Sequence, residues 1–554
     1  MNLESVISSI YQAVVSIANS IWAFLDTIKT LYDYYASALE STTGKNFFGF
    51  SEFLTGFAIL MIAWTTTDYK FQFRIQISKF PQKTLYIIAI VIGAIALVCD
   101  FLSAIEILCS LVHLIIQLIC AAVLFSFVAY WMTRAFLKPP IFNQSNCERY
   151  KTEFFRVCDY GTDEELNVIT QEMSDSVDTL VDSALDYEKD KESKSFSKIQ
   201  EQILYIFTRM GTERFCRIAA KNGFGEKLLL RIVSKGKYNV GLESFADNFI
   251  TEALKYDESF ILNDTNPRNA HLGSSLTKIK DIYGNKDLLL RLYGLIQPDI
   301  SSTRNWNIKQ VKAYVTCLLT AFDTCYGERA IKFSFLKAYE ILENTIKRCC
   351  SQEDSDIESK DLFEGTIYFY QKVIDTSFTQ KDIFKQKYSY SDKFPEQDFI
   401  DYFVDSVIKI IYFASTVRGD IQYRETIQNE LCLNKIFPNS DPQNDCIAFY
   451  KKLNEAILLK VRQNQDLVGI YTLFFFLERC GLQINPDLKN KYLIELHTEL
   501  LSYTAQHFHE MFKNACQYAA FKMPESLSID QNKGILYLRR NSISPKEELT
   551  FTIQ

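Results

Sequence analysis

Two long runs without a charged residue constrain the fold of this chain more than any other feature. They cover residues 84–99 and 107–132, and the second holds 26 consecutive residues without Asp, Glu, Lys or Arg. About 20 apolar residues in a helix suffice to cross a bilayer. Only a short segment that carries Asp100 and Glu106 separates the two runs. The sequence therefore predicts two membrane-spanning helices joined by a tight acidic turn.

Basic residues on both flanks of these runs predict their orientation. The flanking residues are Lys70, Arg74, Lys79 and Lys83 before the first run, and Arg134 and Lys138 after the second. Because Lys and Arg accumulate in cytoplasmic loops, both flanks are expected in the cytoplasm. Everything beyond Pro140 is then expected to be cytosolic.

The N-terminal segment has the pattern of a third amphipathic helix. Its apolar residues alternate four and three apart and form a heptad seam of Ile7, Ile10, Val14, Ile17, Ile21 and Phe24. A polar stripe of Ser9, Gln12, Ser16 and Asn19 runs along the opposite face. The segment either spans the membrane or lies flat on its surface. We favour spanning, because interfacial helices usually carry a Lys or Arg face, which is missing here.

Residues 47–69 form another apolar run, which is expected to span as well. Four spans place both ends of the membrane part inside, whereas three would leave the N-terminal helix outside. The following KFQFRIQI, residues 70–77, alternates polar and apolar positions. That alternation predicts a short strand or a segment lying along the membrane interface.

Composition limits the classes of partner and compartment. The net charge of −7 and the isoelectric point near 5.6 argue against a general nucleic-acid binder, which needs a concentrated basic surface. Fourteen cysteines occur without a C-x-x-C pair. This usage is typical of free thiols in a reducing compartment. The basic and aromatic stretch 381–394 is interpreted as a solvated linker rather than a contact for single strands.

The remainder of the chain predicts an all-α region that ends in a small β-hairpin. One helix is expected from Leu166 to Tyr187 and another over Ile331, Phe335, Leu342 and Ile346. The apolar run 467–477 is too short to span and predicts a buried core helix. Segments starting at Gly534 and Leu549 predict the two strands. The expected division is 1–140 for the membrane module, 141–355 for one helical domain and 356–554 for a second.

No motif for catalysis is present. The chain lacks G-x-S-x-G, a P-loop lysine motif and H-E-x-x-H. Gly223 and Gly225 lack the third glycine of a dinucleotide site. His507 and His509 would face different sides of a helix, with His497 two to three turns earlier. We therefore predict no enzyme activity, no cofactor and no metal.

One polar stripe stands out within the second apolar run. Glu106, Ser110, His113 and Gln117 recur four, three and four residues apart, so they share one helix face. Polar side chains in hydrocarbon are costly and normally face other helices or water. The stripe therefore predicts either part of a polar path through the membrane or hydrogen bonds that hold helices together.

The plan of a small multi-span module followed by a large cytosolic helical region is similar to that of membrane-acting effectors in bacterial defence systems, of the abortive-infection type. The resemblance is architectural and transfers no residues. It implies an inner-membrane sensor or effector that binds a protein partner through its cytosolic part, and whose membrane helices oligomerise and permeabilise the bilayer. The alternative is a membrane-tethered scaffold without a pore or catalysis.

Overall fold

The structure is a computed structural model of the full chain. It describes residues 23, 51–58, 68–80, 82–105, 108, 110–186, 197–265, 277–325, 329–351, 357–379, 399–418, 420–438, 447–463, 467–483, 488–539 and 546–553. The chain divides into two compact units, Met1–Thr179 and Leu180–Gln554. Unit 1 thus contains the apolar hairpin together with the first helices after it. The boundaries expected at 140 and 355 stay predictions.

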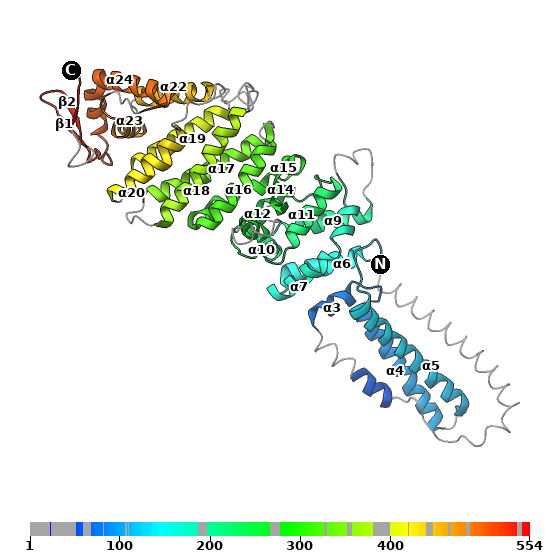
Figure 1. The fold of residues 1–554 in the computed structure, drawn as a ribbon. Coiled ribbons are helices and arrows are strands. Elements are labelled where there is room, and N and C mark those ends of the chain that lie inside the picture. The colour runs from blue at the N-terminus through cyan, green and yellow to red at the C-terminus, as the bar shows by residue number, and fades with distance from the viewer. Residues whose placement is uncertain are drawn as a thin grey trace. The chain divides into compact units, whose positions relative to one another are not determined.

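Unit 1 is built from helices (Figure 1). In chain order they are α3 (Tyr69–Gln76), α4 (Gln82–Ala104), α5 (Ser110–Met132), the π-helix η2 (Thr133–Leu137), α6 (Cys147–Tyr160) and α7 (Asp163–Ser174). The short α8 (Val177–Ser183) lies at the boundary between the units. The predicted acidic turn was wrong in extent, because α4 continues through Asp100 to Ala104.

Two helices of the described residues are long and apolar enough to cross a membrane, Lys83–Ala104 and Val112–Leu137. They pack against each other as the α4–α5 hairpin. Only 28% and 22% of their most apolar stretches is buried. Large apolar side chains such as Ile87 and Phe125 are 63% and 75% exposed, unlike those of a soluble core helix. The expected count of four spans is not shown.

Part of the third apolar run also packs on the hairpin. Residues 51–58 are helical, and Phe53 is buried in a cluster with Ile92 of α4 and Cys120 of α5. A Cβ added at Gly93 would lie 2.2 Å from the Phe53 ring. The lack of a side chain at Gly93 is therefore what lets this ring approach α4 so closely. The N-terminal heptad seam and its polar stripe lie outside the described residues.

Helix α3 replaces the strand or interfacial segment that the KFQFRIQI alternation predicted. Three consecutive side chains, Phe73, Arg74 and Ile75, are buried. A strand would alternate its faces, whereas these neighbours are covered on several sides of one helix. The side chain of Asp68 accepts a hydrogen bond from the backbone N–H of Lys70 and caps the first turn.

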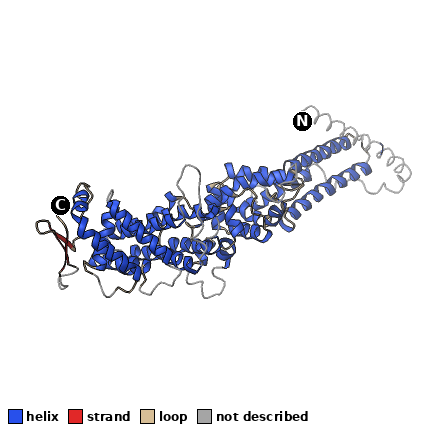
Figure 2. Ribbon diagram, turned by 90° about the horizontal axis from the view of Figure 1, so that it is seen from above, coloured by secondary structure: helices blue, strands red, loops and turns tan. Residues whose placement is uncertain are grey.

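Unit 2 is a succession of helices that ends in a small sheet (Figure 2). Its first part holds α9 (Lys198–Met210), α10 (Glu213–Lys221), α11 (Phe224–Lys235), α12 (Glu243–Ala253), α13 (Phe260–Asp264), α14 (Thr277–Tyr283), α15 (Lys286–Arg291) and the 3₁₀-helices η4 (Tyr293–Ile296) and η5 (Ile300–Asn305). Its second part holds α16 (Ile308–Cys325), α17 (Arg329–Ser351), α18 (Ile357–Thr379), α19 (Phe399–Ser415), α20 (Ile421–Glu425), the π-helix η6 (Thr426–Leu433), α21 (Asn434–Ile436), α22 (Ile447–Gln463), α23 (Leu467–Cys480) and α24 (Lys491–Ala515).

Helices of unit 2 pack mainly on near neighbours in the chain. Helix α10 contacts α12, α16 contacts α18, α17 contacts α19, and α23 contacts both α22 and α24. This is the packing of stacked helices, in which each element buries its apolar face against the next. The core helix predicted over 467–477 is confirmed, since α23 buries every residue from Gly469 to Leu477. Three of the four residues predicted on one helix, Phe335, Leu342 and Ile346, are buried on α17.

Two sequence predictions for the chain beyond Pro140 needed correction. The helix expected from Leu166 to Tyr187 is interrupted at Asp175 and Ser176, between α7 and α8. The C-terminal hairpin is a three-stranded antiparallel sheet of β1 (Leu527–Asp530), β2 (Ile535–Leu538) and β3 (Glu547–Thr550), in the order β1-β2-β3. The predicted strands correspond to β2 and β3, and the sequence analysis missed β1.

Candidate functional site

Three polar side chains meet inside the apolar α4–α5 hairpin. His113 Nε2 lies 2.9 Å from Asp100 Oδ1, and Gln117 Nε2 donates to the same oxygen at 3.3 Å. The Nε2 atoms of His113 and Gln117 are 3.1 Å apart. His113 is 8% and Gln117 1% exposed, so the cluster is largely enclosed by the two helices.

The cluster lies toward the turn between α4 and α5. At 1.5 Å per residue, Asp100 is about 6 Å from the end of α4, and His113 is about 4.5 Å from the start of α5. Hydrogen bonds between helices in a bilayer contribute about 0.6–2 kcal/mol each. The cluster can therefore fix the register of the two helices, and it places a carboxylate beside an imidazole within an apolar surrounding.

The structure brings together half of the predicted stripe and adds a residue to it. His113 and Gln117 are in the cluster, whereas Glu106 and the side chain of Ser110 lie outside the described part. The sequence analysis placed Asp100 in the turn. Its position directly after the first apolar run does not identify its partners, because these depend on the register of α4 against α5.

A second polar cluster holds the base of the hairpin. Arg74 of α3 is 8% exposed, and its guanidinium donates to both carboxylate oxygens of Glu172 on α7, at 2.6 and 3.0 Å. Its Nη1 donates to the backbone carbonyl of Ala135 at 2.7 Å. One buried side chain therefore joins the segment before the hairpin, the segment after it and α7. We call this set of contacts the base clamp.

Surrounding residues reinforce the base clamp. Lys70 Nζ lies 3.2 Å from Glu172 Oε1. Tyr69 donates to Glu153 on α6 at 2.8 Å. Burial raises the pKa of Tyr69 and the Glu153 carboxylate raises it further, so the phenol stays protonated and keeps donating. Arg156 donates to both Glu153 and the Tyr69 hydroxyl.

Aromatic contacts complete the connection between the hairpin and α6. The Phe73 ring meets the Tyr150 ring edge-on, with ring centroids 5.5 Å apart. The ring centroids of Phe71 and Phe136, which belongs to η2, are 4.3 Å apart. In η2 the hydrogen bond from Lys138 N to Thr133 O, 2.7 Å, closes a wider turn than an α-helix has. Such π-helical turns are frequent at functional sites. Thus α3, η2, α6 and α7 form one packed body at the base of the hairpin.

His497 and His507, both on α24, have different surroundings. His497 is buried with Nε2 2.8 Å from the carbonyl oxygen of Gly481, while the His507 ring packs on Tyr503. Within the described ranges no group of three His, Cys, Asp or Glu side chains is placed to hold a metal ion. The 12 cysteines in those ranges are free thiols.

Comparison of the chain with protein-family models, with curated proteins and with solved structures finds no match. The sequence analysis missed the base clamp entirely. It counted Arg74 only as a charge that sets orientation, and nothing local to Arg74 identifies a partner 98 positions later in the chain.

Proposed function

We propose that this chain is a membrane-anchored sensor and effector. The α4–α5 hairpin spans the bilayer with both ends in the cytoplasm, and the helical unit 2 binds a protein partner there. Partner binding alters the membrane helices, which associate with other copies through the N-terminal heptad seam and open a polar path. Two observations support the membrane placement. The hairpin helices expose large apolar side chains, and Lys and Arg residues flank the hairpin at its base.

The observation that carries the proposal is the base clamp. A domain that is only tethered to a membrane needs a linker, and a flexible one is sufficient. Here Arg74 is buried and holds α3, η2 and α7 together at both ends of the hairpin. A displacement of α7 must therefore either move the hairpin helices or break a buried ion pair. This arrangement couples α7 mechanically to the hairpin.

Asp100, His113 and Gln117 are proposed as polar residues of the conducting state. The test replaces all three with Leu and measures ion leak in liposomes that contain the full-length protein. Because the three polar side chains are replaced together, none of the three is left alone in hydrocarbon, and insertion should persist. We expect leak to fall to the level of protein-free liposomes.

Ser126→Leu is the matched control. Its hydroxyl is exposed and bonds to the carbonyl of Ala122 on its own helix, so its loss should leave the leak unchanged. Unchanged leak in the triple variant would remove the polar path from the account.

The second candidate function is a membrane-tethered scaffold without a pore. It is favoured by one observation: Asp100, His113 and Gln117 satisfy one another within a single hairpin, as expected for residues that only hold two helices together. A scaffold predicts that unit 2 keeps its cellular activity on an unrelated membrane anchor, whereas the sensor and effector loses it.

A further inference from the structure

Basic residues gather at the end of the α4–α5 hairpin that adjoins α3 (Figure 1). Lys79 lies just before α4, and Lys83 is in its first turn. Arg134 is in η2, directly after α5, and Lys138 follows the last residue of η2. The start of α4 lies beside the end of α5, so all of these residues belong to the same end of the hairpin. We call Lys79, Lys83, Arg134 and Lys138 the base cations.

Two of the base cations lie over neighbouring aromatic rings. Lys79 Nζ is 5.7 Å from the centroid of the Phe80 ring, and the guanidinium carbon of Arg134 is 5.7 Å from that of the Tyr130 ring. The Phe80 and Tyr130 rings meet edge-on, with ring centroids 5.5 Å apart. A cation over an aromatic face is attracted to it. One positive charge from each side of the hairpin is therefore held at its base.

The carboxylates of the base clamp and its surroundings contact other cations. Glu172 accepts from Arg74 and lies 3.2 Å from Lys70, and Glu153 accepts from Arg156. No base cation has a carboxylate partner among the residues that the structure describes. The protein itself therefore leaves the charge of the base cations without a close counter-charge.

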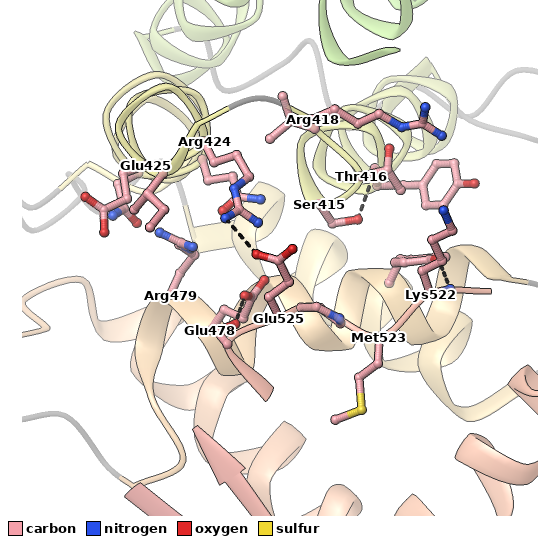
Figure 3. A pocket seen from close by; sticks show the side chains of 18 of the residues that line it. Ser415, Thr416, Arg418, Arg424, Glu425, Glu478, Arg479, Lys522, Met523 and Glu525 are labelled. Carbon is pink, nitrogen blue, oxygen red and sulfur yellow. Dashed lines mark hydrogen bonds and ion pairs between the residues drawn. The ribbon is translucent and has the colours of Figure 1, made fainter. Parts of the chain in front are cut away.

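Charge is arranged differently in a cavity of about 1030 Å³ in unit 2. Cations and carboxylates line it together, and Arg424 lies 3.5 Å from Glu525 (Figure 3). Opposite charges this close offset much of each other's field. The base cations lack such neighbours in the described part of the chain, so an anion from outside the protein is attracted more strongly to the base of the hairpin.

The surface beside the base cations is apolar and aromatic. Leu137 is 76% and Phe136 48% exposed, and Tyr130 and Trp131 stand near the end of α5. Tyr and Trp are enriched where the lipid tails meet the headgroups. Lys and Arg near the ends of a span extend their charged groups toward the headgroups. In the spanning hairpin proposed above, the base cations therefore lie at the depth of the lipid phosphates.

We propose that the base cations bind the headgroups of anionic phospholipids in the cytoplasmic leaflet. Clusters of about four to eight Lys or Arg residues directly beside a span recognise such lipids. Their N–H groups donate to phosphate oxygens in charge-assisted hydrogen bonds. A zwitterionic headgroup carries its own cation, which offsets its phosphate, so a headgroup with net negative charge binds more tightly. The inference rests on the proposed membrane placement and adds to it a lipid of defined charge as a partner.

The test counts the phospholipids that bind to each molecule of the full-length protein in neutral detergent, by native mass spectrometry. The probes are phosphatidylglycerol and phosphatidylcholine with the same acyl chains, and soluble glycerol 3-phosphate. We expect phosphatidylglycerol to bind at a lower concentration than the other two probes. Equal binding of phosphatidylcholine would overturn the proposal, because the site would then not recognise charge. Equal binding of glycerol 3-phosphate would also overturn it, because the ligand would then be a soluble anion.

A variant without the base cations locates the site. It combines Lys79→Gln, Lys83→Gln, Arg134→Gln and Lys138→Gln. Each cation beside a lipid surface contributes about fivefold, so this variant should bind phosphatidylglycerol at least about 100-fold more weakly. Its binding of phosphatidylcholine should not change, which also shows that the hairpin remains folded.

Four substitutions in unit 2 form the matched control. Lys280→Gln, Lys312→Gln, Lys347→Gln and Lys513→Gln change the net charge by the same amount at exposed positions. This control should bind phosphatidylglycerol as the wild type does. Wild-type affinity in the variant without the base cations would overturn the assignment of the site. Equal weakening in the variant and the control would overturn it as well, because only net charge would then matter.

Flotation with liposomes separates this inference from the membrane placement on which it rests. The protein should float with liposomes of pure phosphatidylcholine, because insertion of an apolar helix requires only the hydrocarbon interior. Failure to float with any liposome would contradict the membrane placement itself. Flotation together with equal binding of the two phospholipids would overturn the lipid site and leave the membrane placement standing.

Discussion

Replacing Leu118 and Phe125 together with Arg is expected to prevent α5 from inserting into a membrane. The two residues are seven apart on one face of α5 and are 54% and 75% exposed. An Arg near the centre of a span costs about 2.5–3.5 kcal/mol on the insertion scale, so two cost about 5–7 kcal/mol. The 12 Val, Leu, Ile and Phe residues of α5 contribute only about 4–7 kcal/mol in total on that scale.

The chain contains a sequence that can report whether α5 has failed to insert. Asn263-Asp-Thr265 matches the acceptor sequence for N-glycosylation. If α4 inserts and α5 does not, this segment is carried across the membrane. In translation with microsomes the wild type should remain unglycosylated, and most of the double variant should gain a glycan.

Tyr160→Arg with Tyr205→Arg supplies the control, with two arginines at positions 86% and 46% exposed outside the apolar runs. This control should behave as wild type. A double variant in α5 that also behaves as wild type would show that its exposed face does not contact lipid.

Replacing Arg74 with Met should open the base of the hairpin. The substitution leaves Glu172 buried without the guanidinium that contacts both its oxygens. Breaking a buried pair in this way typically costs about 3–5 kcal/mol. Amide hydrogen exchange in α3 and η2 should therefore accelerate by about two to four orders of magnitude, if these amides exchange through opening of the base clamp.

Two further variants distinguish the effect of losing the ion pair from the effect of changing the size of the Arg74 side chain. Arg74→Met with Glu172→Leu removes both charges and should recover most of the protection, because an apolar pair of similar volume is tolerated. Recovery stays incomplete, since the Ala135 carbonyl still loses its donor. Arg156→Met removes a partly exposed pair at the same base and should change exchange by less than about fivefold, as an exposed pair contributes at most about 1 kcal/mol. Equal effects of Arg74→Met and Arg156→Met would refute a buried clamp.

Sequence periodicity and charge predicted the elements whose pattern lies within one segment of the chain. Helices α4 and α5 follow from charge-free runs of spanning length, and α23 from a run that is apolar on all faces but too short to span. Strands β2 and β3 follow from residue type and spacing. In each case the pattern lies within the element itself, so local sequence is sufficient.

Pairings between distant segments could not be predicted in this way. The local sequence around Arg74 predicts a solvated charge in a loop, because it gives no sign of α7. The same sequence predicts a strand for α3, because nothing in it indicates burial by η2, α6 and α7. Asp100 depends on the antiparallel register of α4 and α5. The contact between the Phe80 and Tyr130 rings joins the segment before α4 to the end of α5. No pattern within one segment indicates such a contact.

Labelling of introduced cysteines on intact cells tests the membrane placement most directly. Ten of the 12 described cysteines are buried, and burial raises the pKa of thiols such as Cys349, to about 12, which keeps them unreactive. Replacing Cys109, Cys158, Cys446 and Cys516 with Ser therefore gives a background with low reactivity that retains the buried core.

In that background Ser103→Cys lies in the last turn of α4, next to the connection to α5, and Tyr160→Cys at the end of α6. A membrane-impermeant maleimide should label position 103 on intact cells and position 160 only after the cells are opened. Labelling of position 160 on intact cells, with position 103 protected, would place α6 outside the cell and contradict the account.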